Sequence, residues 1–514
     1  MTSSLAILPS PNDPLHDLLN ELLELKQRIL SGTVKQLAEL SVDNTHSECL
    51  LSLENLLHYI VMRREDLRPL QARLAKAGLS SLGRGEPHVL DNIERVINLL
   101  ARAVLQQSSG DRNNHPPVDY ETGHRLLRKR AEKLFGKARA QRDGYIMVTM
   151  PSEAAANFEL VNQLVAAGMD TARINCAHDD SATWHNMIIN IRLAAKLQER
   201  NCRILMDLGG HKIRTRHIIT SKDKAGSKSS KKHARVHHND WLVLSKKRGS
   251  PEVYDALFDV PVKAVITCSY PDIIRQLHKN ETVWIDDGKI GTVIREKRGD
   301  AVLLQVNRAG PRGARIKQEK GLNFPETRLN LPALSERDRK DLQFVSQHAD
   351  MVGLSFAECA EDVLHLQEQL RVHGADDIAV IAKIETARAV KNLPDIISGA
   401  LAHNIQLGIM VARGDLAIEL GSVRMAEIQE EILWVCEAAH LPVIWATQVF
   451  ESLAKNGLAS RPEITDAAMA ARAECVMLNK GPYIDYAVSI LSDILQRMGD
   501  HQYKKISRLR ALHW

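Results

Sequence analysis

The sequence lacks the cysteine spacing of a metal centre or a disulfide framework. Its seven cysteines are scattered over 514 residues, form no C-x-x-C pair and are odd in number. Reduced thiols of a cytosolic protein fit this pattern better than disulfides or a zinc site do. We therefore predict a cytoplasmic protein whose cysteines are free.

Long hydrophobic runs are also missing. The sequence has no stretch of about 18 uninterrupted apolar residues, which is the length that a membrane-spanning helix needs. The first residues, MTSSLAILPSPNDP, carry no basic segment followed by a long apolar run. We therefore expect neither a secretory signal nor a membrane partner.

A strong charge of one sign is absent as well. The formal net charge of +5 is small, and 44% apolar with 25% charged residues is ordinary for a globular protein. Residues 221–233 are basic and of low complexity, but they contain no aromatic side chain on which a base could stack. We interpret this segment as a solvated loop, with His233, His237 and His238 as loop residues rather than metal ligands, and we expect no nucleic-acid partner.

The rhythm of the sequence changes near residue 144. Before it, residues 13–105 repeat apolar side chains at helical spacing, starting from Asp13–Pro14, an N-cap followed by proline. A polar linker, QQSSGDRNNHPP, follows them. We expect residues 1–140 to form a helical extension and linker. Its apolar faces must be buried against the rest of the chain or a second subunit, and we expect a homo-oligomer.

After residue 144, short β-branched runs alternate with longer helical segments, which is typical of βα units. Eight runs are the number of strands in a closed barrel, although an open doubly wound sheet would show the same alternation. We expect an α/β fold; the count favours a TIM (β/α)8 barrel built from residues 141–215 and 329–514, with the open sheet as the alternative that the rhythm alone leaves open. The eight runs are Tyr145–Thr149, Thr171–Asn175, Arg203–Asp207, Met351–Ser355, Ala379–Lys383, Leu407–Val411, Pro442–Ala446 and Cys475–Leu478.

The third and fourth runs are separated by about 140 residues, far more than a loop needs. Within this gap, Thr282–Ile285, Lys289–Glu296 and Ala301–Asn307 have the composition of short strands. We predict an inserted β-rich lid domain over residues 216–328. It would sit at the mouth of the barrel, where loops carry function.

In a barrel enzyme the reacting groups stand at the carboxyl ends of the strands. Here those ends carry cations, carboxylates and hydroxyls, with no pair of a nucleophile and a histidine. They are Arg173, Asn175, Asp207, Arg214, Ser355, Lys383, Glu385, Arg413, Asp415, Thr447 and Gln448.

These residue types favour the binding of a phosphoryl group and a hard metal ion. Glu385 and Asp415 offer the oxygen ligands that Mg²⁺ prefers. Lys383 lies two residues before Glu385, so both side chains share one face of an extended strand end. Arg173 and Arg214 suit bidentate contact with phosphate. Each residue alone would more often be an ion-pair partner, but the set indicates electrostatic clamping of a transferring phosphoryl group.

Residues 144–495 resemble pyruvate kinase in a co-linear series of motifs. AGMDTARINCAH is similar to A-G-M-x-x-A-R-x-N-x-S-H, and DLGGHKIRT to D-T-K-G-P-E-I-R-T. WIDDGKI and EKGLNFPETRLNLPALSERD resemble the lid domain and the return from it. IAKIETARAVKNL, IMVARGDLAIEL, PVIWATQVFESL and SRPEITDAAMA resemble further signature blocks of the family.

The resemblance implies the last step of glycolysis, phosphoenolpyruvate plus ADP giving pyruvate plus ATP, with Mg²⁺ or Mn²⁺ as cofactor. The implied catalytic residues are Lys383, Thr447 and Arg173, and the substrate would contact Arg173, Lys383, Gly414, Asp415 and Thr447. The implied metal ligands are Glu385 and Asp415. The implied nucleotide-binding residues are Asn175, His178, Arg214 and Lys320.

The sequence also departs from the family pattern. The first barrel turn reads TMPSEA instead of T-x-G-P-x-S, and MLNKGPYIDYAV is shorter than the family's M-L-S-x-E-T-A-x-G-x-Y-P segment. Both changes alter the barrel rim beside the nucleotide. The chain also stops soon after the barrel closes, so we expect neither the usual C-terminal regulatory domain nor its regulation by sugar phosphates.

A further departure concerns the monovalent cation that many pyruvate kinases bind through asparagine, serine, aspartate and threonine. Asn175 and Asp207 are retained, but Ala177 and Leu208 stand at the serine and threonine positions. Lys212 occupies the position where potassium-dependent members carry glutamate. The resemblance therefore implies that Lys212 is a surrogate for the monovalent cation and that K⁺ is not required.

Three alternatives remain open on the sequence alone. One is a pyruvate kinase relative with a shifted substrate or nucleotide. Another is a non-catalytic regulatory or scaffold protein that acts through its N-terminal helices, although intact Lys383, Glu385 and Asp415 argue against it. The third is a different phosphoenolpyruvate-using barrel such as a lyase, which the lid insertion disfavours.

Overall fold

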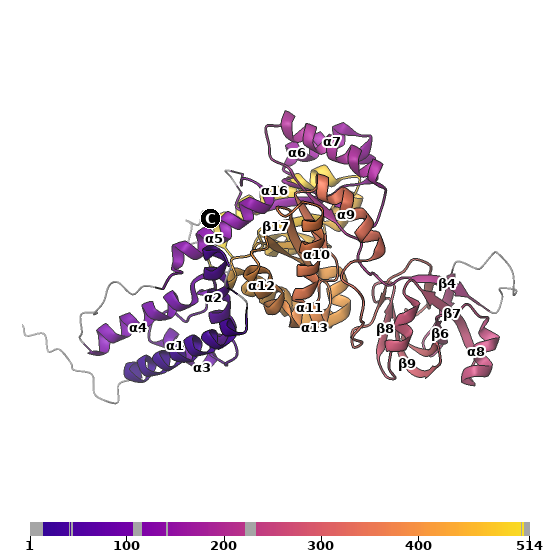
Figure 1. Cartoon of the computed structure of the whole chain (residues 1–514), viewed down its shortest axis with the longest axis horizontal. Coiled ribbons are helices and arrows are strands. Elements are labelled where there is room, and N and C mark those ends of the chain that lie inside the picture. Colours follow the sequence, from indigo (N-terminus) through magenta and orange to yellow (C-terminus); the bar gives the residue numbers. More distant parts are fainter. Residues whose placement is uncertain are drawn as a thin grey trace, which may run out of the picture.

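The computed structural model describes residues 14–40, 42, 45–105, 116–139, 142–220, 233–504 and 506–507 of the chain. A helical block, a barrel and a β-rich lid lie along the long axis of the molecule, with the barrel in the middle (Figure 1). Asp13 and most of the predicted linker fall outside the described residues.

Eight parallel strands close into a barrel in the order β1-β17-β16-β15-β14-β13-β3-β2, so the predicted barrel is confirmed and the open sheet is excluded. Each predicted run coincides with a strand to within one residue at each end. The strands are β1 (Tyr145–Thr149), β2 (Thr171–Asn175), β3 (Arg203–Asp207), β13 (Met351–Leu354), β14 (Ala379–Ile384), β15 (Leu407–Ala412), β16 (Val443–Ala446) and β17 (Cys475–Leu478).

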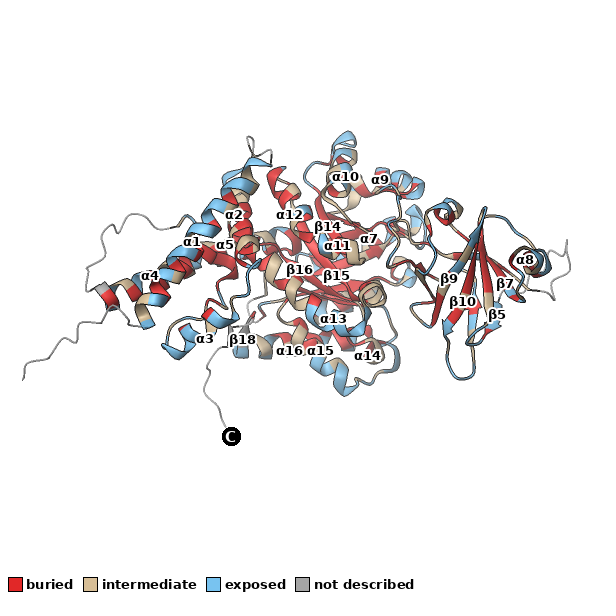
Figure 2. Ribbon diagram, turned by 90° about the horizontal axis from the view of Figure 1, so that it is seen from below, coloured by how far each residue is buried: buried red, intermediate tan, exposed pale blue. Residues whose placement is uncertain are grey.

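Helices surround the barrel and bury the outward face of its strands. They are α6 (Phe158–Ala167), α7 (Ser181–Leu197), α9 (Glu336–His348), α10 (Ala360–Val372), α11 (Ala387–Lys391), α12 (Leu393–Ala402), α13 (Arg413–Ala438), α14 (Glu451–Asn456), α15 (Arg461–Ala470) and α16 (Ile484–His501). Both faces of the strands are buried, as Figure 2 shows, which explains why they read as nearly continuous apolar runs.

Side chains along β14 alternate between the core outside the barrel and the core inside it. Val380, Ala382 and Ile384 belong to the core shared with the surrounding helices, whereas Ala379 and Ile381 belong to the core inside the barrel. Lys383 is the next residue of the inward series, because successive side chains of a strand point to opposite faces. The strand thus carries this lysine into the barrel at its carboxyl end.

The helical block comprises α1 (Pro14–Ala38), α2 (Ser47–Met62), α3 (Arg68–Lys76), α4 (Val89–Leu105) and α5 (Tyr120–Phe135). Helix α5 closes the amino-terminal end of the barrel. Ala131, Leu134 and Phe135 form one buried cluster with inward-facing strand residues, among them Met147 and Ile381. The apolar end of α5 is therefore buried within the same chain.

A buried asparagine joins the helical block to the barrel. The Asn55 amide on α2 donates to the carbonyl oxygen of Glu86 at 2.8 Å and to that of Ala438 at 2.7 Å. Its side-chain oxygen accepts from the amide of Val89 at 2.9 Å. Asn55 is only 2% exposed, so water cannot replace these partners.

His440 extends this polar contact. Its ring is fully buried, with Nδ1 2.9 Å from the Ser52 hydroxyl and Nε2 2.8 Å from the Pro87 carbonyl oxygen. Burial lowers the pKa of His440 to about 3, so its ring is neutral at physiological pH. A neutral ring with one donor and one acceptor nitrogen can satisfy both partners without a buried charge.

The segment predicted to be a lid folds into β-sheets of its own. Its seven-stranded sheet contains β4 (Thr215–Ile219), β6 (Trp241–Ser245), β7 (Val262–Cys268), β8 (Thr282–Ile285), β9 (Ile290–Arg298), β10 (Ala301–Arg308) and β12 (Leu322–Asn323). Strands β5 (His233–Val236) and β11 (Ala314–Lys317) form a second pair, and α8 (Pro251–Phe258) packs against β7. The three predicted strands match β8, β9 and β10 to within two residues at each end.

The interpretation of His233 as a loop residue is wrong, because this residue begins β5 opposite Lys317. His237 lies with its Nδ1 3.7 Å from the Asp240 carboxylate. Across the described ranges there is no group of three or more His, Cys, Asp or Glu side chains arranged to hold a metal ion.

All seven cysteines are free, as their scattered spacing predicts. In the parts of the chain that the structure describes, none of the helices has both the length and the apolar character that crossing a membrane requires.

The contacts of Asn55 lead to a stability prediction. Asn55→Ala should lower the free energy of unfolding by about 2–4 kcal/mol, because it leaves buried carbonyl and amide groups without partners. Thermal and urea unfolding of the two proteins would measure the loss. Asn98→Ala, an exposed position on α4, is the matched control and should change stability by less than about 0.5 kcal/mol. Equal stability of the Asn55 variant and the wild type would contradict the prediction.

Candidate functional site

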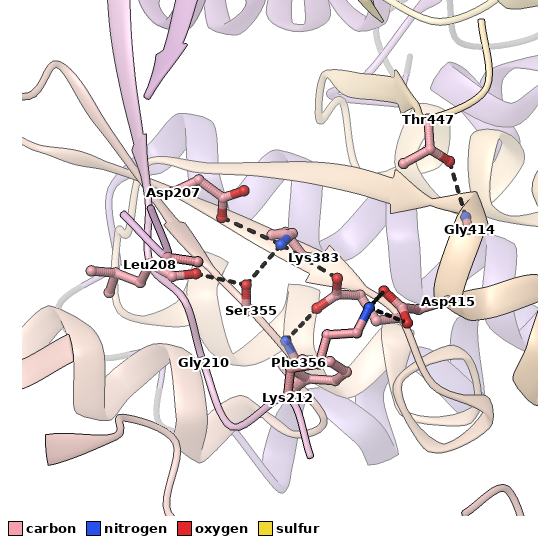
Figure 3. Close-up of polar contacts among 12 residues, drawn as sticks. Asp207, Leu208, Gly210, Lys212, Ser355, Phe356, Lys383, Gly414, Asp415 and Thr447 are labelled. Carbon is pink, nitrogen blue, oxygen red and sulfur yellow. Dashed lines mark hydrogen bonds and ion pairs between the residues drawn. The ribbon is translucent and has the colours of Figure 1, made fainter. Parts of the chain in front are cut away.

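The carboxyl end of the barrel holds a buried lysine among acidic groups. Lys383 is 8% exposed, and its ammonium donates to the Ser355 hydroxyl at 2.7 Å (Figure 3). It also lies 3.4 Å from Asp207 Oδ1 and 3.3 Å from Glu385 Oε1. Burial disfavours the ammonium, but the two carboxylates outweigh this effect and raise the pKa of Lys383 above its ordinary value. The lysine therefore carries a fixed positive charge.

Asp207 links this lysine to an arginine. Arg173 donates from Nε at 2.8 Å and from Nη2 at 2.5 Å to Asp207 Oδ2, and from Nη1 to the Thr149 hydroxyl at 2.9 Å. Burial would raise the pKa of Asp207, but Lys383 and Arg173 outweigh it and hold that pKa below its ordinary value. The position of the Asp207 carboxylate depends on the absence of a side chain at residue 353, because a Cβ at Gly353 would lie 2.6 Å from Asp207 Oδ1.

Ser355 has a positioning contact that sequence reasoning did not assign. Its hydroxyl donates to the Leu208 carbonyl oxygen at 2.8 Å while accepting from Lys383. With its own proton committed to the carbonyl, the hydroxyl presents a lone pair to the ammonium. The only signal in the sequence was its position at the end of the fourth strand.

Glu385 and Asp415 provide a donor set that fits a hard divalent cation. Glu385 is buried, and its Oε2 accepts from the backbone amide of Phe356 at 2.7 Å. Burial and the nearby charge of Asp415 raise the pKa of Glu385, and Lys383 opposes them. Two neighbouring carboxylates that disfavour each other's charge call for a cation between them, and oxygen ligands of this kind suit Mg²⁺ or Mn²⁺.

In this structure the cation on Asp415 is Lys212. The Lys212 ammonium lies 2.8 Å from Oδ1 and 2.9 Å from Oδ2 of Asp415 (Figure 3). This contact differs from the sequence expectation, in which the lysine would place its charge beside Asn175 and Asp207. Asp207 already has two cationic partners, whereas Asp415 would otherwise face Glu385 without a counter-ion, so the ammonium lies where negative charge is least compensated.

Thr447 and Gly414 are brought together at the next two strand ends. The Thr447 hydroxyl accepts from the backbone amide of Gly414 at 2.9 Å. Thr447 and Gln448 have φ angles of 66° and 60°, so a strained turn projects the threonine after β16. Arg413 instead has a structural role, because it pairs with Asp466 through Nη1 at 2.5 Å and Nη2 at 2.8 Å.

The predicted nucleotide-binding residues divide into two groups. Asn175 and His178 line a cavity of about 270 Å³ together with Arg173 and Lys480. Burial and the charge of Lys480 lower the pKa of His178, so its ring is neutral at physiological pH. Lys480 was not predicted as a site residue, although it lies in the shortened segment after β17.

Arg214 and Lys320 lie instead where the inserted β domain joins the barrel, outside the residues that line this cavity. Arg214 Nη1 donates to the Glu319 carbonyl oxygen at 3.1 Å, and the Lys320 ammonium lies 2.9 Å from Asp286 Oδ1. The two segments also meet through the bridge between Arg214 and Gly321. In the described conformation Arg214 therefore joins the entry segment of the inserted domain to its return segment, whereas Lys320 joins the return segment to Asp286 after β8.

A larger cavity of about 580 Å³ lies between the lid return and the barrel. Lys212, Ser355 and Glu419 are among its lining residues. Glu419 lies one helical turn after Asp415, and its Oε1 accepts a long hydrogen bond of 3.4 Å from Asn323. Burial raises the pKa of Glu419 to about 7, and the charges of Glu358 and Asp415 add to this effect.

The whole arrangement can hold an anion with several oxygens. Fixed ammonium and guanidinium groups face the barrel mouth, and a pair of carboxylates beside them can hold a divalent cation. No serine or cysteine nucleophile paired with a histidine is found among the described side chains at this end. The site therefore suits stabilisation of negative charge that moves between oxygen atoms rather than covalent catalysis.

The fold and the charged strand ends define a lidded (β/α)8 barrel with a cation-rich mouth. A family model described as "Pyruvate kinase, barrel domain" matches residues 141–483. The chain belongs to the pyruvate kinase family.

Named relatives agree with this assignment. The chain is 33% identical to a pyruvate kinase of Geobacillus stearothermophilus over 323 residues, which is 62% of this chain and 49% of the relative. It is 30% identical to that of Bacillus licheniformis over 368 residues, 70% of this chain and 58% of the relative. It is 31% identical to pyruvate kinase 1 of Trypanosoma brucei brucei over 369 residues, 70% of this chain and 68% of the relative. The chain thus spans about half the length of the first of these relatives.

Glu419 gives a prediction about pH. Its pKa of about 7 in the folded protein exceeds the ordinary value of about 4.3. The folded state therefore holds this proton more tightly, and stability falls as the pH rises from about 4 towards 7. In metal-free buffer, Glu419→Gln should raise the melting temperature at pH 8 and have a smaller effect at pH 5.

Differential scanning calorimetry at the two pH values would test this expectation. Glu427→Gln, an exposed position on the same helix α13, is the matched control and should show no such dependence. If the Glu419 variant is no more stable than the wild type at pH 8, the pKa of Glu419 is not raised in the folded protein and the prediction is wrong.

Proposed function

We propose that this chain transfers the phosphoryl group of phosphoenolpyruvate to ADP, giving pyruvate and ATP. The observation that carries the proposal is the buried Lys383 ammonium, held by Ser355, Asp207 and Glu385 at one end of a family-type barrel. A buried charge that is fixed before the substrate arrives is the type of group that stabilises a transferring phosphoryl group.

In the proposed reaction a β-phosphate oxygen of ADP attacks phosphorus, and the bond from phosphorus to the enol oxygen breaks. Lys383 and Arg173 stabilise the charge on the phosphoryl oxygens, and Lys383 also faces the enolate oxygen that is left behind. The enolate then takes a proton at its methylene carbon to give pyruvate, with Thr447 beside that face. Gly414 and Asp415 orient the three-carbon acid.

The proposed metal ligands are Glu385 and Asp415. A divalent cation bound there would supply Lewis-acid charge to the phosphoryl and carboxylate oxygens. Asn175 and His178 would contact the nucleotide from the barrel. Arg214 and Lys320 would contact it from the hinge, after a movement of the lid that also excludes water.

The test is a coupled assay of pyruvate formation with ADP and with other nucleoside diphosphates. Lys383→Met should keep the fold but lower turnover by about two to three orders of magnitude, because one preorganised charge is lost. Lys196→Met, on the exposed face of α7, is the control and should retain full activity. Undiminished turnover of the Lys383 variant would remove this lysine from the mechanism.

We also propose that the reaction does not require potassium. Ala177 and Leu208 lack the oxygen side chains of a monovalent-cation site, and the remaining carboxylate, Asp207, is paired with Arg173 and Lys383. Lys212 stands where potassium-dependent members carry glutamate, so a negative charge that could attract K⁺ is missing at this position. A bound K⁺ would meet repulsion of about 4 kcal/mol from a unit charge a few ångströms away at an effective dielectric constant of 20.

Rates in sodium-free buffer with and without KCl, at fixed ionic strength, should therefore be equal. Strong activation by KCl would overturn this proposal, and Lys212→Glu should then do little harm. The cytoplasmic location and the homo-oligomer stay predictions.

A further inference from the structure

We propose that Lys212 is an internal counter-ion of Asp415, which a divalent cation displaces when it binds. The inference rests on the proposed metal site of Glu385 and Asp415, but it does not depend on the phosphoryl-transfer reaction itself.

The contact has the geometry of an occupied cation site. The Lys212 ammonium is within 2.9 Å of both oxygens of Asp415, the same atoms that the carboxylate would offer to a metal. The two side chains are 25% and 16% exposed, so the pair is shielded from bulk water more than a surface salt bridge is. Ammonium and metal therefore compete for the same ligand atoms.

The charges of the cluster are already balanced without a metal. Asp207, Glu385 and Asp415 contribute three negative charges. Three positive charges face them: Arg173 contacts Asp207, Lys383 contacts both Asp207 and Glu385, and Lys212 contacts Asp415. A divalent cation that joined them would leave two uncompensated positive charges in a partly buried site, which is costly. Release of the Lys212 ammonium from Asp415 relieves part of this cost.

The hinge provides room for the lysine stem. A Cβ at Gly321 would lie 3.3 Å from Lys212 Cε, so the return strand of the lid passes close to the lysine at a residue without a side chain. The amide of Leu322 donates to the carbonyl oxygen of Ile213 at 2.8 Å, which fixes this return strand beside the backbone of the lysine. The counter-ion thus comes from the link between barrel and lid, and its stem has rotatable bonds that allow it to leave.

Displacement makes metal binding an exchange of cations. The metal must replace an ion pair instead of entering a free carboxylate site, so its affinity is lowered by the strength of that pair. Lys212→Met should therefore bind Mn²⁺ about five- to tenfold more tightly than the wild type in the absence of any substrate. Electron paramagnetic resonance of free Mn²⁺ during a titration measures this directly.

Lys289→Met is the matched control. Lys289 is a lysine of the lid whose ammonium pairs with Asp286 at 3.1 Å instead of Asp415. Its replacement also removes one paired lysine charge, but one that does not contact Asp415, and should leave the Mn²⁺ affinity unchanged within about twofold. Unchanged or weaker Mn²⁺ binding by a folded Lys212→Met protein would overturn the proposal. If that variant fails to fold, Lys212→Gln takes its place.

A second measurement uses the wild-type chain and separates displacement from a simple field effect. Acetic anhydride modifies lysine at a rate that rises when the amine is released from an ion pair. Lys212 should be acetylated several-fold faster in saturating Mn²⁺ than in EDTA, as followed by mass spectrometry. Asp415→Asn should show the fast rate in EDTA. Equal rates for the wild type with and without bound Mn²⁺ would overturn the proposal.

Both measurements are made without phosphoenolpyruvate or ADP, so they are independent of the proposed reaction. Absent pyruvate formation with faster acetylation in Mn²⁺ would refute the proposed function and leave the counter-ion in place. Full activity with no change in Mn²⁺ affinity or acetylation would refute the counter-ion alone.

Discussion

The contact between the Lys383 ammonium and its three oxygen partners determines how the carboxyl end of the barrel is organised. A lysine that is 8% exposed cannot stay charged unless nearby groups compensate it. Asp207 compensates it and needs Arg173 in turn, while Ser355 commits its proton to a backbone carbonyl so that its lone pair faces the ammonium. The charged groups at this end thus depend on one another.

The two ends of the barrel separate stability from chemistry. Helix α5 fills the amino-terminal end with Leu134 and Phe135, and Asn55 and His440 join the helical block to the barrel through uncharged hydrogen bonds. All the charged groups of the candidate site lie at the opposite end, beside the lid. The apolar side chains packed at one end stabilise the fold, which offsets the loss of stability caused by the buried charges at the other end.

The barrel could be predicted from the sequence because each strand leaves a local pattern and the pattern recurs eight times. Each strand is a short β-branched run, and Lys383 and Glu385 share a face by strand periodicity alone. The contact of Lys212 was not predictable, because its partner lies 203 residues away and a long flexible side chain can reach several carboxylates. The hydrogen bond of Ser355 was missed for a similar reason, since it depends on the register between β3 and β13. His233 was misassigned because its four-residue strand has too few residues to show alternation, and its pairing partner is distant.

The space that Gly353 leaves open has a consequence for how this site can vary between related proteins. A Cβ at this position would lie 2.6 Å from Asp207 Oδ1, so any other residue there would force the carboxylate to shift. A shift of this carboxylate changes its contacts with both Lys383 and Arg173, although residue 353 itself bears no functional group. A substitution at position 353 should therefore disturb the charged site without touching a reactive side chain, and an inventory of reactive side chains would overlook this constraint.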